Sequence, residues 1–284
     1  MINVEELSYT YLGTDSPAVK DINFNIQAGE IFGFLGPSGA GKSTTQKVLI
    51  RLLRDYQGQV TILNRDLANW GQDFFEKIGV SFELPNHYSK LTGIENLTYF
   101  SSLYAGPSRD LQKLLEQVGL EKDGEMLTSQ YSKGMKNRLN VARSLVHDPE
   151  LLFMDEPTAG LDPLNARRIK DLILRQKQSG KTIFLTTHDM TVADELCDRL
   201  AFIVDGKISL IDSPANLKLR YGKPEIKVEF QGSGEMKQAV FPLKGLAENQ
   251  KFQQVLQENQ IRTMHSQEAT LERIFIEVTG RKLV

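Results

Sequence analysis

A glycine-rich stretch between residues 36 and 43 has the residue types and spacing of a phosphate-binding loop. The pattern Gly, four residues, then Gly-Lys-Ser is met by Gly36, Pro37, Ser38, Gly39, Ala40, Gly41, Lys42 and Ser43. The glycines allow the backbone to turn with its N–H groups facing inward around phosphate oxygens. Lys42 adds a positive charge for the β- and γ-phosphates, and the Ser43 hydroxyl is suited to Mg²⁺. The sequence therefore predicts a nucleotide site.

The residues on either side of this loop disfavour the alternative, which is a chance match in a glycine-containing turn. Residues 30–35 are typical of a short buried strand. Apolar residues then recur at helical spacing, at Val48, Leu49, Leu52 and Leu53. This order places the loop at a helix N-terminus, where the helix dipole favours anions.

Two adjacent carboxylates, Asp155 and Glu156, follow an apolar run at residues 151–154. Four consecutive apolar residues are typical of a strand buried on both faces, and ligands bind at the carboxyl ends of such strands. Close to a polyphosphate, Asp155 is suited to organise the Mg²⁺ shell and Glu156 to orient or deprotonate the attacking water. The alternative is a plain surface pair of acids.

His188 ends a second apolar run, at residues 183–187. A lone histidine is usually structural, but here it ends a strand of the same kind as the one before Asp155. We therefore expect His188 to face the same crevice and to form a hydrogen bond with a γ-phosphate.

Composition limits the remaining possibilities. The 284 residues are 40% hydrophobic and 25% charged, with a formal net charge of −2, which argues against a nucleic-acid-binding surface over the whole protein. The single cysteine, Cys197, rules out an internal disulfide. No apolar run reaches the roughly 18 to 20 residues that span a bilayer, and the N-terminus lacks the features of a signal peptide. A soluble chain is expected, with any membrane role exerted through a partner.

The chain order predicts strands at 4–11, 19–26, 58–63 and 78–83, and a hairpin at 201–210. Helices are expected between the strand at 78–83 and the apolar run at 151–154. Thr92 and Glu95 fit a capping box that opens one helix, and Ser132 fits the N-cap of another. Because these helices interrupt the β/α alternation, we interpret residues 85–147 as an inserted helical subdomain.

A second, smaller unit follows a short helix that begins at Ser213-Pro214. We expect the first domain to span residues 1–221 and the accessory domain to span residues 222–284. Ile226, Val228 and Phe230 alternate with charged residues, and two amphipathic helices follow. About sixty residues make a small core, so this unit is expected to pack on the main domain or on its twin.

Taken together, these features resemble the ATP-binding cassette (ABC) family, in order and spacing, from residue 1 to about 221. The phosphate loop, Tyr131–Met135, Leu151–Glu156 and His188 carry the resemblance. The tail at 271–280 resembles the C-terminal extension of separate ATPase subunits in drug- and lipid-type exporters. The resemblance implies an α/β fold of the P-loop NTPase type: a mixed sheet core, an antiparallel β part, the helical subdomain and a small α+β extension.

Carried over to this chain, the resemblance implies a role for each matching residue. Tyr11 would stack on adenine, and residues 36–43 with Thr44 would bind the triphosphate of ATP. Ser43, Glu83 and Asp155 would serve Mg²⁺, Glu156 would be the general base, and His188 would sense the γ-phosphate. Asp162 would link two active sites, and the signature residues Ser132, Lys133 and Gly134 would contact the γ-phosphate of the opposite subunit.

Two positions depart from the family pattern. Lys133 stands where the signature usually has its first glycine, and we expect ATP-driven closure to tolerate a basic residue near phosphate. Glu83 stands where the family typically has glutamine at the Mg²⁺ and at the membrane-coupling groove. We expect its added charge to bind the cation more strongly, so that closure depends more on Mg²⁺. The alternative is a solvated acid at a strand end.

The resemblance further implies a head-to-tail dimer with a second copy or a similar ATPase subunit, in which two chains share two ATP sites. The mechanical work of dimer closing and opening would be transmitted to a separate integral membrane permease. That permease would hold the chain at the cytoplasmic face of the membrane. A soluble cassette ATPase acting on nucleic acid or ribosomes is the alternative, although such proteins usually carry two cassettes or long coiled-coil insertions. A small-molecule phosphotransferase would not need Ser132-Lys133-Gly134. No nucleic acid partner is expected.

Overall fold

The computed structural model describes residues 1–106, 109–232, 235–266 and 269–281. The backbone divides into two compact units, residues 1–213 with 281, and Pro214–Gly280. No helix within the described ranges is long and apolar enough to cross a membrane.

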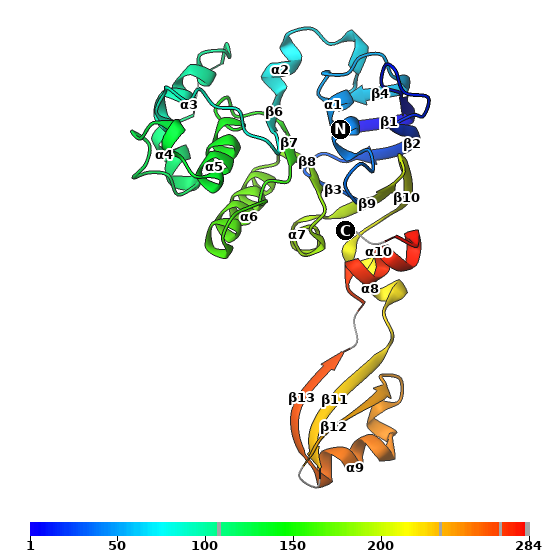
Figure 1. The fold of residues 1–284 in the computed structure, drawn as a ribbon. Helices are drawn as coiled ribbons and strands as arrows, with labels where there is room; N and C mark the ends of the chain where they lie inside the picture. Colours follow the sequence, from blue (N-terminus) through cyan, green and yellow to red (C-terminus); the bar gives the residue numbers. More distant parts are fainter. Residues whose placement is uncertain (107–108, 233–234, 267–268, 282–284) are drawn as a thin grey trace. The chain divides into compact units, whose positions relative to one another are not determined.

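The first unit contains two sheets (Figure 1). An antiparallel sheet has the order β2 (Val19–Ile26), β1 (Ile2–Tyr9), β4 (Gln57–Ile62) and β5 (Arg65–Asp66). A six-stranded sheet has the order β10 (Lys207–Asp212), β9 (Arg199–Val204), β3 (Ile31–Leu35), β8 (Thr182–Thr187), β7 (Leu151–Asp155) and β6 (Ile78–Ser81). Only β10 pairs antiparallel in the larger sheet. The carboxyl ends of β3, β7 and β8 therefore share one edge.

The helices of this unit are α1 (Lys42–Leu49), α2 (Asp73–Lys77), α3 (Gly93–Ser101), α4 (Leu111–Gln117), α5 (Lys133–Arg143), α6 (Pro163–Gln178) and α7 (Met190–Leu196). Short 3₁₀ turns lie at Leu67–Asn69 and Thr128–Gln130. In Figure 1, α3, α4 and α5 gather beyond the β6 end of the larger sheet. The inserted group of helices expected from the sequence is thus present.

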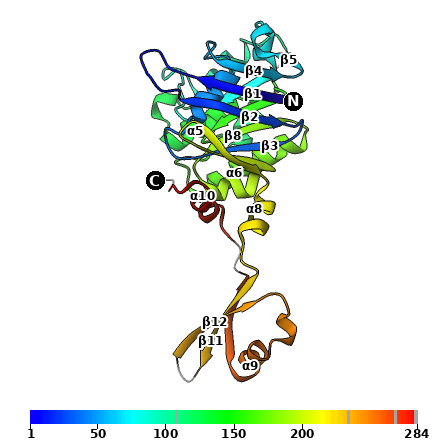
Figure 2. The ribbon, with the colours of Figure 1, turned by 90° about the vertical axis from the view of Figure 1, so that its right-hand side faces the viewer.

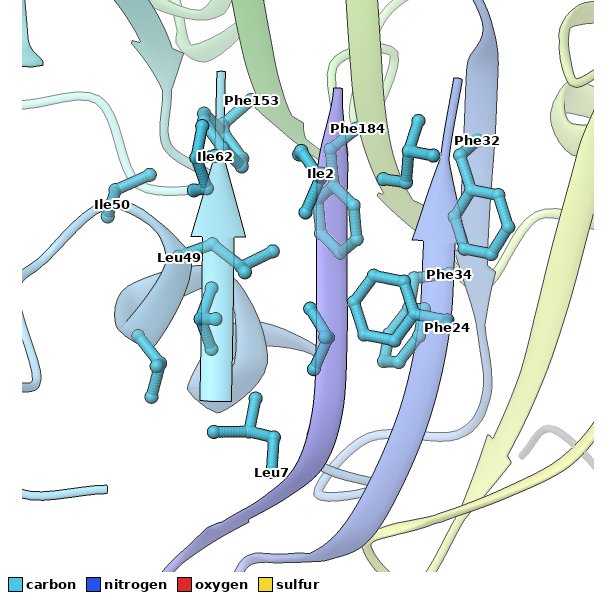
Figure 3. Packing of buried hydrophobic residues seen from close by; sticks show 14 of the residues in the cluster. Ile2, Leu7, Phe24, Phe32, Phe34, Leu49, Ile50, Ile62, Phe153 and Phe184 are labelled. Carbon is cyan, nitrogen blue, oxygen red and sulfur yellow. The ribbon is translucent and has the colours of Figure 1, made fainter. Parts of the chain in front are cut away.

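A single apolar cluster joins the two sheets through α1. The antiparallel sheet supplies Ile2, Phe24 and Ile62, the larger sheet supplies Phe32, Phe34, Phe153 and Phe184, and α1 supplies Val48 and Leu49. Figure 3 labels all of these side chains except Val48, and Figure 2 shows the antiparallel strands as one layer of the unit. This packing fixes the helix that follows the phosphate loop.

Local sequence signals account for the ends of several elements. The capping box of Thr92 and Glu95 opens α3, and the Ser132 hydroxyl accepts a hydrogen bond from the Met135 N–H at the start of α5, both as predicted. The strand expected at 78–83 ends at Ser81, since Asn140 of α5 donates a hydrogen bond to the Phe82 carbonyl (2.7 Å). The segment from residue 82 onward is therefore tied to the helical group.

The second unit contains α8 (Pro214–Tyr221), β11 (Glu225–Gly232), β12 (Glu235–Pro242), α9 (Gln250–Glu258), β13 (Gln260–Ser266) and α10 (Leu271–Thr279), with a 3₁₀ turn at Leu246–Glu248. Its antiparallel sheet has the order β12, β11, β13. The helix at 214–221, placed with the first domain on sequence grounds, contacts α10, so the compact units divide after Ser213. The assignment of two functional domains stays a prediction.

Candidate nucleotide-binding site

The phosphate loop connects β3 to α1, as predicted, and two of its glycines are required by the geometry. Gly41 is the N-cap of α1 with φ of 108°, a conformation that favours glycine, and a Cβ there would lie 2.7 Å from the Ala18 carbonyl. A Cβ on Gly36 would lie 2.1 Å from the Ile203 carbonyl oxygen. No side chain caps α1. Its first N–H groups therefore remain for an anion.

Lys42, the first residue of α1, is buried and bends back over the loop. Its Nζ donates to the carbonyl oxygens of Gly36 (2.6 Å) and Pro37 (3.0 Å). Burial lowers the pKa of Lys42, while the nearby carboxylates Glu156, Asp155 and Glu83 oppose that shift. The structure thus brings together Lys42 and the three acids that the sequence singled out.

Asp155 is the last residue of β7 and lies next to the phosphate loop. The Ser43 hydroxyl donates to one of its oxygens (3.4 Å), and the Thr186 hydroxyl of β8 donates to the other. Burial raises the pKa of Asp155, and the charges of Glu156 and Glu83 raise it further. Ionising this carboxyl is therefore unfavourable without a cation or further donors.

These oxygens fit Mg²⁺. A buried carboxylate and a hydroxyl lie side by side at the N-terminus of the helix that would hold the phosphates. Mg²⁺ prefers hard oxygen ligands and usually takes one or two carboxylates together with phosphate oxygens and water. A cation at this position would also offset the repulsion that raises the pKa of Asp155.

Glu156 and His188 are in direct contact at the ends of β7 and β8. The Glu156 carboxylate accepts hydrogen bonds from the His188 Nδ1 (2.6 Å), the His188 backbone N–H (2.8 Å) and the Thr187 hydroxyl (2.9 Å). Glu156 is 7% exposed and has φ of 49°, an uncommon conformation for a side chain other than glycine. Three donors and a left-handed backbone hold the carboxylate in one orientation.

Thr186 and Thr187 were not identified as site residues from the sequence. Both hydroxyls are buried, and each binds one of the paired acids. The available signal was their position, since they are polar residues at the end of an otherwise apolar strand that leads to His188.

Glu83 is exposed and begins no regular element. Its charge acts on both Lys42 and Asp155, so its side chain belongs to the same electrostatic cluster. Arg143 donates to the Asn86 carbonyl (2.7 Å) and to the Asn140 side chain (2.6 Å). The segment 82–86 is thus held by α5, and the charge of Glu83 within it acts on the nucleotide site.

A groove of about 410 Å³ begins beside Glu83. It is lined by Ile50, Leu52, Phe75, Ile78, Val80, Phe82, Leu84, Asn86, Phe100, Tyr104, Arg143 and Ser144. Leu84 is 77% exposed and Leu52 is 58% exposed. Phe82 and Leu84 both line this groove, and the residue between them in the chain is Glu83, whose charge acts on Lys42 and Asp155.

Tyr11 contacts the phosphate-loop helix through its hydroxyl, which lies 3.2 Å from the Thr44 hydroxyl. Its ring meets Tyr9 edge-on at 5.0 Å and remains 36% exposed. An exposed ring beside the phosphate loop is compatible with stacking on a base.

A second group of predicted site residues lies at the N-termini of α5 and α6. It consists of Ser132, Lys133, Gly134 and Asp162. Ser132 caps α5, and Asp162 caps α6 by accepting a hydrogen bond from the Asn165 N–H (3.0 Å). Asn137 of α5 ties the helix to the Ala159 carbonyl (2.7 Å), and Gly134 adjoins Gly160 and Leu161. Across the described ranges, no hydrogen bond or ion pair joins this group to residues 36–43. Within one chain the two groups are therefore separate.

Comparison with known proteins shows which family the chain belongs to. A sequence profile described as "ABC transporter" matches residues 19–159, and one described as "Fluoroquinolone efflux ABC transporter C-terminal domain" matches residues 225–268. A fluoroquinolones export ATP-binding protein of Mycobacterium tuberculosis is 56% identical over 284 residues, which is 100% of this chain and 94% of the relative. The chain belongs to the ABC transporter ATP-binding proteins. The family and fold class expected from the sequence are confirmed.

Further relatives of the cassette agree with this. A bacitracin transport ATP-binding protein of Bacillus licheniformis is 36% identical, with 78% of this chain and 72% of the relative covered. A dimeric bacterial ABC transporter cassette superposes with a TM-score of 0.69 at 29% identity, covering 75% of this chain and 99% of that one. A dimeric cassette bound to ADP and Pi gives 0.68 at 28% identity. The chain is the ATP-binding, ATP-hydrolysing subunit of an ABC exporter, as expected.

Proposed function

We propose that this ABC subunit hydrolyses ATP at sites shared between two copies and drives the export of fluoroquinolone-type compounds through a separate membrane protein. The observation that supports the chemistry is the fixed Glu156 carboxylate, held by His188 and Thr187 beside Lys42. The 56% identity over the whole chain supports the cargo class. The cytoplasmic face of the membrane is the proposed location.

The residues divide the work of hydrolysis. The N–H groups of residues 36–44 and the Lys42 ammonium hold the β- and γ-phosphates, and Tyr11 supports the base. Ser43 and Asp155 provide oxygens for the accompanying Mg²⁺, which when bound neutralises charge on the phosphates. Glu156 orients the attacking water and accepts its proton, and His188 positions Glu156 through Nδ1 while its exposed edge can reach the γ-phosphate.

The signature group completes the site of a second copy. Ser132, Lys133 and Gly134 lie at the N-terminus of α5, where N–H groups and the Lys133 charge favour phosphate. Asp162 caps the neighbouring α6 and is proposed to connect the two sites. The relatives with dimeric structures support this arrangement. Bound ATP would favour the closed pair because it contacts both copies.

The groove beside Glu83 is the proposed contact with the membrane protein. It is large enough for a few side chains, and it carries exposed Leu52 and Leu84 together with Phe100 and Arg143. Large exposed apolar groups clustered at a groove mark binding surfaces. Since Phe82 and Leu84 line the groove and the charge of Glu83 acts on Lys42 and Asp155, a partner bound there can displace the segment that influences the site.

The export function is tested by co-expressing the chain with the membrane protein encoded beside it in cells sensitive to fluoroquinolones. The pair is expected to lower intracellular norfloxacin, measured by its fluorescence, and the Glu156→Gln pair is expected to leave it at the level of the empty vector. The matched control is Glu125→Gln, an exposed glutamate away from the site. Equal accumulation in all strains would reject the cargo class but leave ATP hydrolysis unaffected.

Replacing Glu83 by glutamine is expected to raise the Mg²⁺ concentration that half-saturates ATP hydrolysis by about 5-fold, because one negative charge is removed from the acid cluster. The measurement is steady-state phosphate release over a Mg²⁺ series at constant ionic strength, with Glu125→Gln as the control. An unchanged Mg²⁺ dependence would show that Glu83 is only a solvated acid.

Replacing Asp155 by asparagine is expected to stabilise the nucleotide-free protein at pH 7. The pKa of Asp155 is raised in the folded chain, so its ionised form opposes folding, and this cost grows as the pH rises above the ordinary carboxyl value. The difference in melting temperature between variant and wild type should therefore shrink as the pH falls towards 4. A variant that melts lower than wild type at pH 7 would contradict the assignment.

A further inference from the structure

A second pocket lies at the other end of α1 from the phosphate loop. Its volume is about 370 Å³, within the range of small-molecule sites. It is lined by Arg51, Leu53, Arg54, Tyr56, Gly58, Gln59, Val60, Asp66, Leu67 and Ala68. None of these residues belongs to the nucleotide site or to the groove beside Glu83, so the pocket is a separate feature of the first unit.

The polar lining is not neutralised internally. Arg51 donates to the Gly71 carbonyl (3.1 Å), and Asp66 accepts a hydrogen bond from the Ala68 N–H (2.8 Å). Throughout the described part of the chain, neither Arg51 nor Arg54 forms an ion pair with Asp66 or with any other acid. Two guanidinium groups and one carboxylate thus leave one positive charge over the pocket.

Part of the pocket lining is apolar and belongs to the core of the first unit. Val60 of β4 and Leu67 are each 1% exposed, and both belong to the main apolar cluster. The Tyr56 ring is half-buried at the wall, and burial together with the charge of Asp66 raises the pKa of its hydroxyl. Tyr56 therefore stays a neutral phenol at physiological pH and presents both a flat face and a hydroxyl.

We propose that this pocket binds a small aromatic monocarboxylate. Guanidinium groups pair with carboxylates through two parallel hydrogen bonds, which Arg51 and Arg54 can offer, and the flat body would lie against Val60, Leu67 and the Tyr56 ring. Asp66 limits the net charge of the ligand that the pocket can bind. Its carboxylate repels a second negative charge, so inorganic phosphate and nucleotides are disfavoured relative to a single carboxylate.

The probe is 2-naphthoate, compared with 2-naphthalenemethanol, which has the same ring system and no charge. Binding to the full chain is measured by saturation-transfer NMR and by the fluorescence of Trp70. Trp70 is the chain's single tryptophan, and its backbone N–H donates to the carbonyl of pocket residue Leu67 (3.4 Å). We expect saturable naphthoate binding with a Kd of about 1 mM or below, at least about 5-fold weaker binding of the alcohol, and no competition by inorganic phosphate.

Two variants keep the proposal falsifiable. Arg54→Gln removes an exposed guanidinium and should weaken naphthoate about 5-fold or more, whereas the control Arg175→Gln, on the exposed side of α6, should not. Ala68→Phe should fill the pocket and abolish binding. Circular dichroism melting confirms that each variant is folded. Absence of saturation up to about 10 mM naphthoate, equal binding of the alcohol, or unchanged binding by Arg54→Gln would each overturn the proposal.

Discussion

Glu156→Gln is expected to lower the rate of ATP hydrolysis by about 100-fold or more while leaving ATP binding intact. Glutamine can accept the hydrogen bonds from His188 at its carbonyl oxygen and can donate its amide N–H to the Thr187 hydroxyl, but it cannot accept a proton from water. General base catalysis typically contributes a factor of about 10² to 10⁴. Phosphate release under saturating ATP measures the effect.

The same variant should accumulate as an ATP-bound dimer, because the bridging γ-phosphate is not removed. Size-exclusion chromatography with light scattering, with and without ATP and Mg²⁺, measures the mass. Glu125→Gln serves as the control, since it removes a carboxylate of the same size outside the site. Wild-type turnover in Glu156→Gln would exclude Glu156 as the general base.

Lys42→Ala is expected to weaken ATP binding by about 100-fold. Lys42 is the only lysine whose ammonium is directed onto the phosphate loop in the described ranges, where it now binds the carbonyls of Gly36 and Pro37. Two charge-assisted hydrogen bonds to phosphate contribute about 3 kcal/mol, which corresponds to that factor. Equilibrium titration with a fluorescent ATP analogue gives the affinity.

Lys47→Ala provides a matched control, because Lys47 lies on the same helix with its side chain exposed. Its ATP affinity should equal that of the wild type. If Lys42→Ala and Lys47→Ala bound ATP equally well, the loop would hold the nucleotide by its backbone alone, and the role given to the Lys42 ammonium would be wrong.

Sequence reasoning located the parts of the site that depend on local spacing. The phosphate loop, the acids after β7 and the Ser132 cap each follow from residues that are close in the chain. Family membership is confirmed by the comparisons, whereas the individual residue roles stay predictions.

Contacts between distant segments could not be predicted in the same way. The hydrogen bond of His188 to Glu156 depends on β8 being the parallel neighbour of β7, which spacing alone does not define. Likewise, the end of β6 at Ser81 depends on Asn140 of α5, almost sixty positions later, taking the Phe82 carbonyl. Long-range pairing, rather than local propensity, decided these features.

The segment around Glu83 connects the nucleotide site with the groove. Asn140 and Arg143 hold it from α5, Phe82 and Leu84 line the groove, and the Glu83 charge acts on Lys42. Displacement of this segment by a partner would change the field at the nucleotide. Through this segment the membrane protein would influence hydrolysis, and hydrolysis would influence the membrane protein.

The central claim, that two copies share each ATP site, is tested most directly by mixing two inactive variants. Lys42→Ala disables the phosphate loop, and Gly134→Asp places a negative charge where the partner's phosphate would lie. A Cβ on Gly134 would meet Leu161 at 3.4 Å, an ordinary contact, so the second variant should fold. In a mixed dimer one site combines the intact loop of one copy with the intact signature of the other. The account predicts that the mixture regains a clear fraction of wild-type ATP hydrolysis, whereas activity no greater than the sum of the two variants alone would contradict it.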